Sequence, residues 1–251
     1  MVKLERAWTQ SPPAVVLKPD EIHVWRVFVD EWLASLPQLR AFLSPDEQAR
    51  AQKFYFERDR NCSIIARGVL RVLLGRYCAL DPSMIMLCYN EFGKPDLASN
   101  DLSLPLYFNL AHSHTTIVYA FTYINRVGID VEYMRTNIEY EELAEHYFSP
   151  VEKAQLQAMS IEQKMQAFFA GWTRKEAYIK ARGKGLSIPL DSFDVTLLPD
   201  QDPRLLDCRE DPQSVSHWTL YALPADPHYA GALALNGVCE HLQFWHLSPL
   251  F

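Results

Sequence analysis

The chain has 251 residues, of which 49% are hydrophobic, and its 24 Lys and Arg against 31 Asp and Glu give a formal net charge of −7. The length and apolar content suffice for one large domain or two small ones. The acidic balance argues against a nucleic-acid-binding protein, because phosphate contacts require clustered Lys and Arg. No apolar run approaches the length of a membrane-spanning helix.

Two further features predict a cytoplasmic protein. Lys3, Glu5 and Arg6 stand where a secretory signal would begin its apolar core. The five cysteines are odd in number and widely spaced, and no CxxC pair occurs. We therefore expect reduced thiols rather than a disulfide framework or a zinc site.

In chain order, the first predicted elements are a strand and a long helical region. Residues 1–20 contain three prolines and are expected to form a loose lead-in, and residues 22–27 alternate as a strand does. Residues 44–47, Ser-Pro-Asp-Glu, have the pattern of a capping box with proline at the first helical position. The helical pattern continues to about Tyr77, as one helix or two. Its predicted apolar face consists of Phe54, Ile64, Ile65, Val69 and Leu73.

The next segment alternates short strands and turns. Strands are predicted over residues 85–89, 106–110 and 116–122. A turn is predicted at residues 92–95, and a polar turn at 111–114 between the last two strands. His112 is thereby expected in a loop that follows a strand.

The pattern then repeats at a spacing of 105 residues. Residues 127–132 are a predicted strand, and residues 149–152, Ser-Pro-Val-Glu, form a second capping box. The segment 42–52 aligns with 147–157 through shared Ser, Pro, Glu, Ala and Gln. Further strands are predicted near residues 193–197, 217–223 and 231–235.

These elements predict an α+β fold of two similar α/β halves, residues 1–124 and 125–251, related by a pseudo-twofold axis. Chance similarity of two capped helices is the alternative. In a duplicated fold we expect the active site in the cleft between the halves, because ligand sites favour such interfaces.

Candidate metal ligands lie at the start of the second half. Asp130 and Glu132 are two residues apart on a predicted strand, so both side chains leave the same face. Two neighbouring carboxylates repel each other unless a cation lies between them, and hard oxygen ligands suit Mg²⁺. Glu176 is a third candidate ligand, from a helix. The alternative is a strand end with solvated acids.

A predicted helix carries a polar face and then ends in a glycine-rich loop. Trp172, Glu176 and Lys180 follow at i, i+4 and i+8 and therefore share one helical face. Gly183 and Gly185 are expected to end the helix and to let another group come close. The plainer alternative is a solvated helix end with an ordinary Glu–Lys pair.

The remaining polar motifs favour phosphate chemistry. Lys94, between Gly93 and Pro95, is presented on a rigid turn and suits a phosphate as a point charge. His112 is as well suited to a loop hydrogen bond as to a ligand contact. No P-loop or dinucleotide-binding glycine pattern occurs, and no GxSxG frame surrounds Ser113. Together with the three acids, these residues predict a Mg²⁺-dependent transfer from a polyphosphorylated donor.

At this point the motifs match a known family. The chain resembles the 4′-phosphopantetheinyl transferases, in particular the larger, monomeric, surfactin-synthetase-activating type, over roughly residues 40–200. The motifs that carry the resemblance are Gly93-Lys94-Pro95, Phe108 to Ser113, Gly128 to Glu132, Trp172 to Lys180, Gly183 to Leu186 and Pro189 to Phe193. The segment from Arg50 to Arg60 extends the match.

The resemblance implies the reaction. The phosphopantetheine arm of coenzyme A is transferred to a serine of an apo acyl or peptidyl carrier protein, and adenosine 3′,5′-bisphosphate is released. Asp130, Glu132 and Glu176 match the family's Mg²⁺ ligands, with Mn²⁺ as an alternative metal. Glu176 also matches the acid that helps to deprotonate the serine, and Lys180 the lysine that protonates the leaving phosphate.

The resemblance also implies contacts with coenzyme A. The matching residues are Arg50, Gly93, Lys94, Pro95, Asn109, His112, Ser113 and Lys180. Two positions depart from the family: Glu47 stands where some relatives carry a lysine directed at the 3′-phosphate, and Ala111 where many carry serine. Each departure removes one contact with the nucleotide.

The expected partners are coenzyme A and a transiently docked carrier protein, with no nucleic acid and no membrane, and the protein is expected to be a monomer. Because the chain is acidic, we expect the carrier to meet an apolar surface with few basic residues. Two other readings stay open: a Mg²⁺-dependent phosphotransferase acting on another nucleotide, and a carrier-binding relative without catalysis.

Overall fold

The computed structural model describes residues 3–4, 7–98, 103–224 and 226–249, and its fold is a mixed α+β one. The helices are α1 (Leu36–Phe42), α2 (Pro45–Gln52), α3 (Glu57–Cys78), α4 (Tyr140–Tyr147), α5 (Pro150–Gln157) and α6 (Ile161–Arg182). The strands are β1 (Lys3–Leu4), β2 (Thr9–Gln10), β3 (Glu21–Phe28), β4 (Leu87–Tyr89), β5 (Pro95–Leu97), β6 (Tyr107–Ser113), β7 (Thr116–Thr122), β8 (Val127–Tyr133), β9 (Phe193–Val195), β10 (Leu205–Cys208), β11 (Trp218–Ala222), β12 (Tyr229–Asn236) and β13 (His241–His246).

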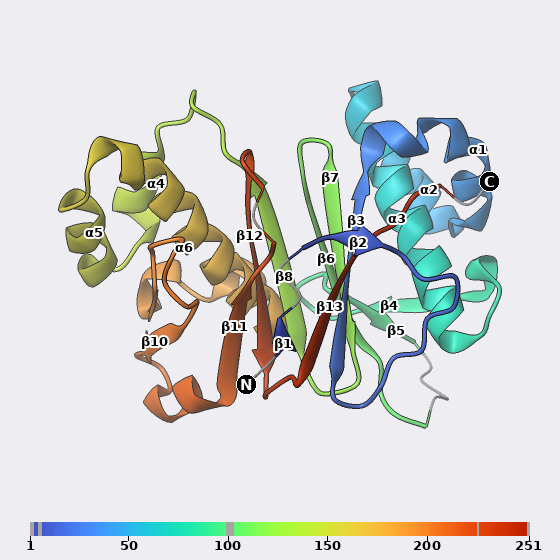
Figure 1. The fold of residues 1–251 in the computed structure, drawn as a ribbon. Helices are drawn as coiled ribbons and strands as arrows, with labels where there is room; N and C mark the ends of the chain where they lie inside the picture. Colours follow the sequence, from blue (N-terminus) through green and yellow to red (C-terminus); the bar gives the residue numbers. More distant parts are fainter. Residues whose placement is uncertain (1–2, 5–6, 99–102, 225, 250–251) are drawn as a thin grey trace.

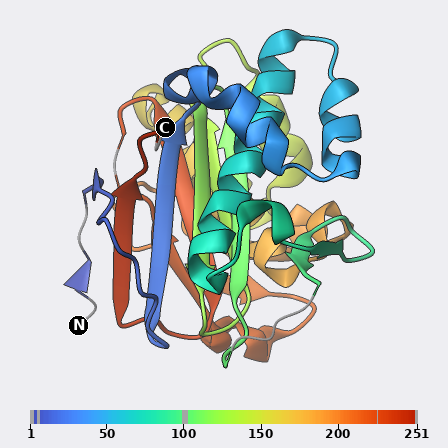
Figure 2. The same cartoon turned by 90° about the vertical axis from the view of Figure 1, so that its right-hand side faces the viewer.

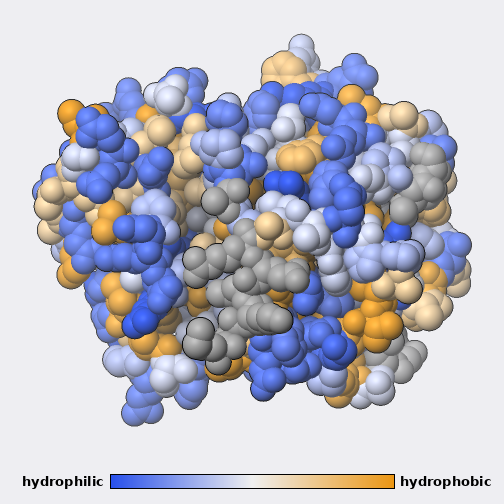
Figure 3. Space-filling view, in the orientation of Figure 1, coloured by the Kyte–Doolittle hydropathy of each residue, from blue (hydrophilic) through white to orange (hydrophobic). Residues whose placement is uncertain are grey.

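The elements form layers, with helices outside and strands inside (Figure 1). Helices α1 to α3 lie on one side of the strands and α4 to α6 on the other. Figure 2 shows α3 in front of the sheet that contains β3. On the face shown in Figure 3, hydrophilic residues are interspersed with apolar ones. None of the described helices combines the length and the apolarity needed to cross a membrane.

Two main sheets meet in the middle of the molecule. One has the strand order β1-β13-β3-β7-β6, with β2 also on β13, and the other has the order β11-β12-β8. Strand β13 runs parallel to β3, so the end of the chain returns to the sheet built by its beginning. Side chains join the sheets where β6 meets β8: Asn109 Oδ1 accepts a hydrogen bond from the Ile129 N–H at 2.8 Å.

Three apolar cores fill the layers. The first lies between α1–α3 and the first sheet, the second between α4–α6 and the other sheet, and the third between the two sheets. Strand β3 serves two of them: Ile22 and Val24 face the core between the sheets, whereas Trp25 and Val27 face the helices. A strand covered on both faces must be apolar on both, which explains the run of hydrophobic residues here.

The predicted helix ends are confirmed. The Ser44 hydroxyl accepts from the Glu47 N–H, and the Glu47 carboxylate accepts from the Ser44 N–H. Ser149 and Glu152 form the same reciprocal pair at the start of α5. Gly183 caps the end of α6 with a φ of 73°, in the left-handed region that glycine adopts without strain.

The predicted helical region of residues 45–77 is two helices, and one predicted core residue is wrong. The N–H groups of Lys53 and Phe54 donate to the carbonyl oxygens of Arg50 and Ala51, three residues earlier. The α-helical hydrogen bonds thus give way to a 3₁₀ turn, and the helix ends there. Phe54 therefore lies between α2 and α3 and is 45% exposed, whereas the other predicted apolar-face residues are buried.

The polar turn predicted at residues 111–114 is mostly strand. His112 pairs with Ile117 and Ser113 with Thr116, so β6 continues to Ser113 and leaves a tight turn at His114, where φ is 54°. The prediction of a loose lead-in over residues 1–20 is also wrong for Lys3–Leu4 and Thr9–Gln10. Both segments are strands, because they pair with the free edge of β13. The predicted strand at 85–89 is shorter and begins at Leu87.

Candidate active site

Helix α6 lies directly against strand β8 because Gly128 has no side chain. A Cβ atom at this position would collide with the backbone of Ala177 and Ala181. The close approach brings the last turns of α6 onto the strand that carries Asp130 and Glu132. Glycine at this position therefore determines where the helix face and the two acids meet.

The helix face predicted from the sequence is confirmed by burial. Trp172, Glu176 and Lys180 are half-buried, whereas every residue between them is buried. Lys175, from the same sequence motif, is fully buried, and its Nζ lies 2.8 Å from Glu152 Oε2. Lys175 is therefore structural, and Glu176 and Lys180 are the charged residues of the motif that reach the site.

Asp130 is the deepest acid of the site and is 3% exposed. Its Oδ1 accepts a hydrogen bond from Lys180 Nζ at 2.6 Å, while Oδ2 is buried without a partner among the described residues. Burial raises the pKa of Asp130 to about 7; the ammonium opposes this rise, and the charges of Glu132 and Glu176 add to it. An added cation beside Oδ2 would favour the ionised carboxylate.

Glu132 lies at the junction of the two sheets. Its Oε2 accepts a hydrogen bond from the Ser113 hydroxyl at 2.7 Å, and the oxygen of that hydroxyl accepts from the Tyr133 N–H at 3.0 Å. Ser113, like Asn109 four residues earlier, thus fastens β6 to β8. The predicted ligand-binding residues Asn109 and Ser113 both use a side-chain oxygen in this junction.

The acids share one ammonium group. Burial raises the pKa of Glu176, and the charge of Glu132 raises it further against the effect of Lys180. Burial by itself lowers the pKa of Lys180, but Asp130, Glu176 and Glu132 outweigh it, and the pKa of Lys180 is raised. Three carboxyl groups facing one Lys are short of positive charge, which suits an added cation.

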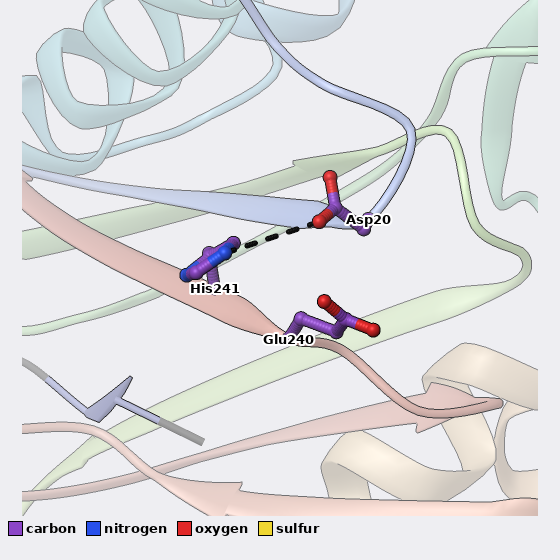
Figure 4. A group of neighbouring side chains, drawn as sticks. All are labelled: Asp20, Glu240 and His241. Atoms are coloured by element: carbon purple, nitrogen blue, oxygen red, sulfur yellow. Dashed lines mark ion pairs between the residues drawn. The ribbon is translucent and has the colours of Figure 1, made fainter. Parts of the chain in front are cut away.

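The donor set fits a hard divalent cation. It comprises three carboxyl groups, and one of their oxygens, Asp130 Oδ2, is buried without a partner among the described residues; Mg²⁺ prefers such oxygen ligands. The described residues contain one group of His, Cys, Asp or Glu ligand atoms that all lie within 4.8 Å of one another, namely Asp20, Glu240 and His241 at the start of β3 and β13 (Figure 4). The predicted acids do not form a group that tight; Lys180 supplies the charge opposite Asp130.

A cleft of about 810 Å³ opens beside these residues. Its walls come from α3, the turn before β5, strand β6 and the end of α6. The charged residues that line it are Arg58, Arg67, Lys94, Arg135 and Lys180 against Asp30 and Asp59. The lining itself therefore has more cations than acids, which favours an anionic ligand. The predicted acids Asp130, Glu132 and Glu176 are not among the lining residues and lie behind Lys180, which pairs with Asp130.

The predicted turn Gly93-Lys94-Pro95 lines the cleft. The Lys94 ammonium donates to the carbonyl oxygens of Val127, at 3.0 Å, and Lys180, at 2.8 Å. Burial lowers the pKa of Lys94 to about 8. The Lys94 side chain therefore links the turn to β8 and to the end of α6. The two carbonyl dipoles partly offset the charge of its ammonium group.

His112 reaches the cleft, but Arg50 does not line it. The cleft walls around the His112 ring lower its pKa, and the charges of Lys180 and Arg67 lower it further. Arg50 is exposed, and its guanidinium lies over the ring of Tyr89, 4.5 Å from the ring centre. The structure thus gathers the other predicted coenzyme A residues in one cleft and sets Arg50 apart from its lining.

The two departures from the family pattern are buried. Glu47 is 4% exposed, and its Oε2 accepts a hydrogen bond from Arg71 Nε at 2.7 Å. Its side chain belongs to the interior, so it does not face a nucleotide in the cleft. Ala111 is also buried, in the core between the sheets.

Sequence reasoning missed the contribution of α3 to the cleft. Asp59, Ser63 and Arg67 all line it. These residues are polar and follow at i, i+4 and i+8, and between Cys62 and Gly75 Ser63 and Arg67 are the two residues that are not buried. That spacing was the available signal, because it puts three polar side chains on one face of the helix.

Comparisons with known proteins identify the family of the chain. The family model described as the N-terminal part of 4′-phosphopantetheinyl transferases matches residues 23–123, and that of the 4′-phosphopantetheinyl transferase superfamily matches residues 126–234. The chain is similar to the 4′-phosphopantetheinyl transferase HetI of Nostoc, with 37% identity over 97% of this chain and 99% of that protein. It is also similar to the 4′-phosphopantetheinyl transferase Sfp of Bacillus subtilis, with 31% identity over 84% of this chain and 90% of that protein. The chain therefore belongs to the 4′-phosphopantetheinyl transferase superfamily.

Proposed function

We propose that this protein transfers the 4′-phosphopantetheine arm of coenzyme A to a serine hydroxyl of an apo acyl or peptidyl carrier protein. Adenosine 3′,5′-bisphosphate is the second product. The observation that carries the proposal is Lys180, which lines the cleft, donates to Asp130 at 2.6 Å and lies one helical turn from Glu176. A cleft with surplus positive charge suits a donor that bears three phosphate groups.

The proposed metal ligands are Asp130, Glu132 and Glu176, and the proposed metal is Mg²⁺, with Mn²⁺ as an alternative. Support comes from Asp130 Oδ2, which has no partner among the described residues, and from the raised pKa values of Asp130 and Glu176, because a nearby cation would stabilise the ionised form of both carboxyl groups. When bound, the metal supplies positive charge that offsets the charge growing on the pyrophosphate.

Glu176 and Lys180 are the proposed catalytic residues. Glu176 accepts the proton of the carrier serine, and its raised pKa suits it to a general base near neutral pH. Lys180 Nζ stays protonated, because the surrounding acids raise its pKa, and its ammonium donates a hydrogen bond to the leaving phosphate oxygen and stabilises the charge that grows there. Both residues lie on the half-exposed face of α6, one turn apart, so both reach the same ligand.

Coenzyme A is proposed to lie in the cleft against Gly93, Lys94, Pro95 and His112, with Lys180 at its reacting end. Asn109 and Ser113 shape this wall through the junction of β6 with β8. Arg50 is proposed as an outer contact, because its guanidinium is exposed over Tyr89.

We further propose that the chain consists of two duplicated halves, residues 1–124 and 125–251, with the site between them. The two capped helices of eight residues, α2 and α5, begin 105 residues apart, and a helix of 22 residues follows each. In each half the glutamate of the capping box pairs with a buried cation of the long helix. The two family models divide at the same place, although strand β13 crosses back to the first sheet.

We also propose that the protein acts as a monomer and that it is located in the cytoplasm. All five cysteines are free in the structure, which is the state that a reducing compartment maintains. The proposed carrier contact is the exposed aromatic run Phe54-Tyr55-Phe56 at the edge of the cleft, an apolar surface of the kind expected for an acidic protein.

The experiment that tests the proposal compares phosphate donors. The protein is incubated with an apo carrier, Mg²⁺ and either coenzyme A or ATP, and the nucleotide products are separated by chromatography. The proposal predicts adenosine 3′,5′-bisphosphate from coenzyme A and no consumption of ATP. Consumption of ATP would favour a phosphotransferase instead, and carrier binding without any turnover would favour a non-catalytic relative.

A further inference from the structure

Asn90 is an exposed residue to which neither the sequence motifs nor the proposed reaction gives a role. It directly follows β4 and opens the cleft turn, residues 90–94, but it is not among the residues that line the cleft. Its side chain nevertheless makes three hydrogen bonds. Oδ1 accepts from the N–H groups of Phe92, at 3.0 Å, and Lys94, at 2.9 Å. Nδ2 donates to the carbonyl oxygen of Gly183, 93 residues later, at 2.6 Å.

The cleft turn fixes the direction in which the Asn90 amide points. Only the oxygen of the amide can accept from two N–H groups, so the NH₂ group must face Gly183. The backbone of Asn90 closes the same turn, because its carbonyl accepts from Gly93 at 3.0 Å and its N–H donates to the Lys94 carbonyl at 3.1 Å. The turn is therefore an ordered unit that directs an amide donor at the end of α6.

The end of α6 supplies the matching acceptors. Carbonyl groups at the end of a helix are short of partners within the helix. Two of them accept from the cleft turn: Gly183 from Asn90, and Lys180 from the Lys94 ammonium at 2.8 Å. Gly183 also permits the close approach, because a Cβ atom there would lie 3.3 Å from Asn90 Nδ2. The cleft turn is thereby held against the helix that carries Lys180.

The two links between the turn and α6 differ in how a ligand affects them. Lys94 lines the cleft, so an anionic ligand competes with the carbonyl oxygens for its ammonium group. Asn90 lies outside the lining, and its bond to Gly183 is not exposed to that competition. The amide link is therefore the one that persists when the cleft is filled.

We propose that Asn90 is a positioning residue. Its amide holds the cleft turn against the end of α6 and so sets how a donor bound at the turn is aligned with the Lys180 ammonium. The alignment with a donor rests on the proposed function, whereas the link between Asn90 and Gly183 does not.

Two substitutions separate this link from the shaping of the turn. Asn90→Asp keeps an oxygen for the two N–H groups of the turn but has no donor for Gly183, and it sets a carboxylate at the negative end of the α6 dipole. Asn90→Ala removes both functions. In both variants kcat at saturating coenzyme A should fall about twofold to tenfold, the range for one hydrogen bond, while the melting temperature stays within about 4 °C. Asn137→Asp is the matched control, because Asn137 is exposed and outside the cleft lining.

Three kinetic outcomes would overturn the inference. Wild-type kcat in Asn90→Asp together with a loss in Asn90→Ala would mean that Asn90 only shapes the turn. A rise of KM for coenzyme A without a fall in kcat would mean that alignment with Lys180 does not depend on it. A fall in melting temperature well beyond 4 °C would make Asn90 a residue for stability.

Amide hydrogen exchange followed by NMR tests the link without any transfer. The N–H groups of Phe92 and Lys94 should stay protected in Asn90→Asp and lose protection in Asn90→Ala, whereas the Gly183 N–H should exchange faster in both. Unchanged exchange at Gly183 in both variants would overturn the link. Faster exchange at Gly183 in a protein that transfers nothing would support the link and defeat the proposed function.

Discussion

Replacing Glu176 with glutamine tests the proposed chemistry without disturbing the fold. The two side chains have the same shape, and the influences on the Glu176 carboxyl are burial and the charges of Lys180 and Glu132 rather than structural hydrogen bonds. The substitution also removes the repulsion by Glu132. We therefore expect the free energy of unfolding to change by less than about 0.5 kcal/mol.

The expected loss of activity follows from the role of the carboxylate. A positioned general base contributes about 10²-fold to 10⁴-fold to the rate, which corresponds to about 3–5 kcal/mol of barrier. Glutamine cannot accept the serine proton, so kcat for carrier modification should fall by about 10²-fold or more. The loss of one of three candidate metal ligands should also raise the Mg²⁺ concentration that is needed for half-maximal rate.

The assay is the rate of carrier modification at saturating coenzyme A, measured by intact mass across a Mg²⁺ titration. Glu162→Gln is the matched control, because it removes an exposed carboxylate from the first turn of the same helix. The control should keep wild-type rates. If Glu176→Gln folded normally and turned over at a near-normal rate, the assignment of Glu176 as base and metal ligand would be wrong.

Three further predictions concern buried positions of the fold. Gly128→Ala should lower the free energy of unfolding by about 1–3 kcal/mol and should also reduce kcat, because the new methyl group pushes α6 away from β8; wild-type kcat in a folded variant would contradict this. Lys175→Met should cost about 3–5 kcal/mol in urea unfolding, since it leaves Glu152 buried without its cation; a loss below 1 kcal/mol would argue against a structural role. Burial lowers the pKa of His23 to about 4, below the value of about 6.5 in an unfolded chain, so its neutral form favours the fold above pH 6.5 and stability falls as the pH drops from 6.5 towards 4. Between pH 7.5 and 5 the wild type should lose about 2 kcal/mol more than His23→Gln, and equal losses would refute this reasoning.

Local signals in the sequence predicted the parts of the fold that local interactions determine. The two capping boxes are correct because each involves a side chain and a backbone group three residues apart. The polar face of Trp172, Glu176 and Lys180 is correct for a similar reason, since helical geometry alone aligns these residues.

The errors arose where distant partners decide the structure. Residues 111–113 looked like a polar turn, but pairing with β7 extends the strand through them. Glu47 was expected near the nucleotide, but its carboxylate is buried and accepts a hydrogen bond from Arg71, 24 residues later. Lys94 lines the cleft, and its hydrogen bonds to the carbonyl oxygens of Val127 and Lys180 are contacts that no local pattern indicates.

Intact mass spectrometry of an apo acyl carrier protein tests the central claim most directly. The carrier is incubated with this protein, coenzyme A and Mg²⁺, and a parallel sample contains EDTA. The account predicts a catalytic gain of one phosphopantetheine mass on the carrier serine, lost in EDTA and in Glu176→Gln. No mass gain on carriers from both fatty-acid and peptide synthesis, with coenzyme A and Mg²⁺ present, would contradict it.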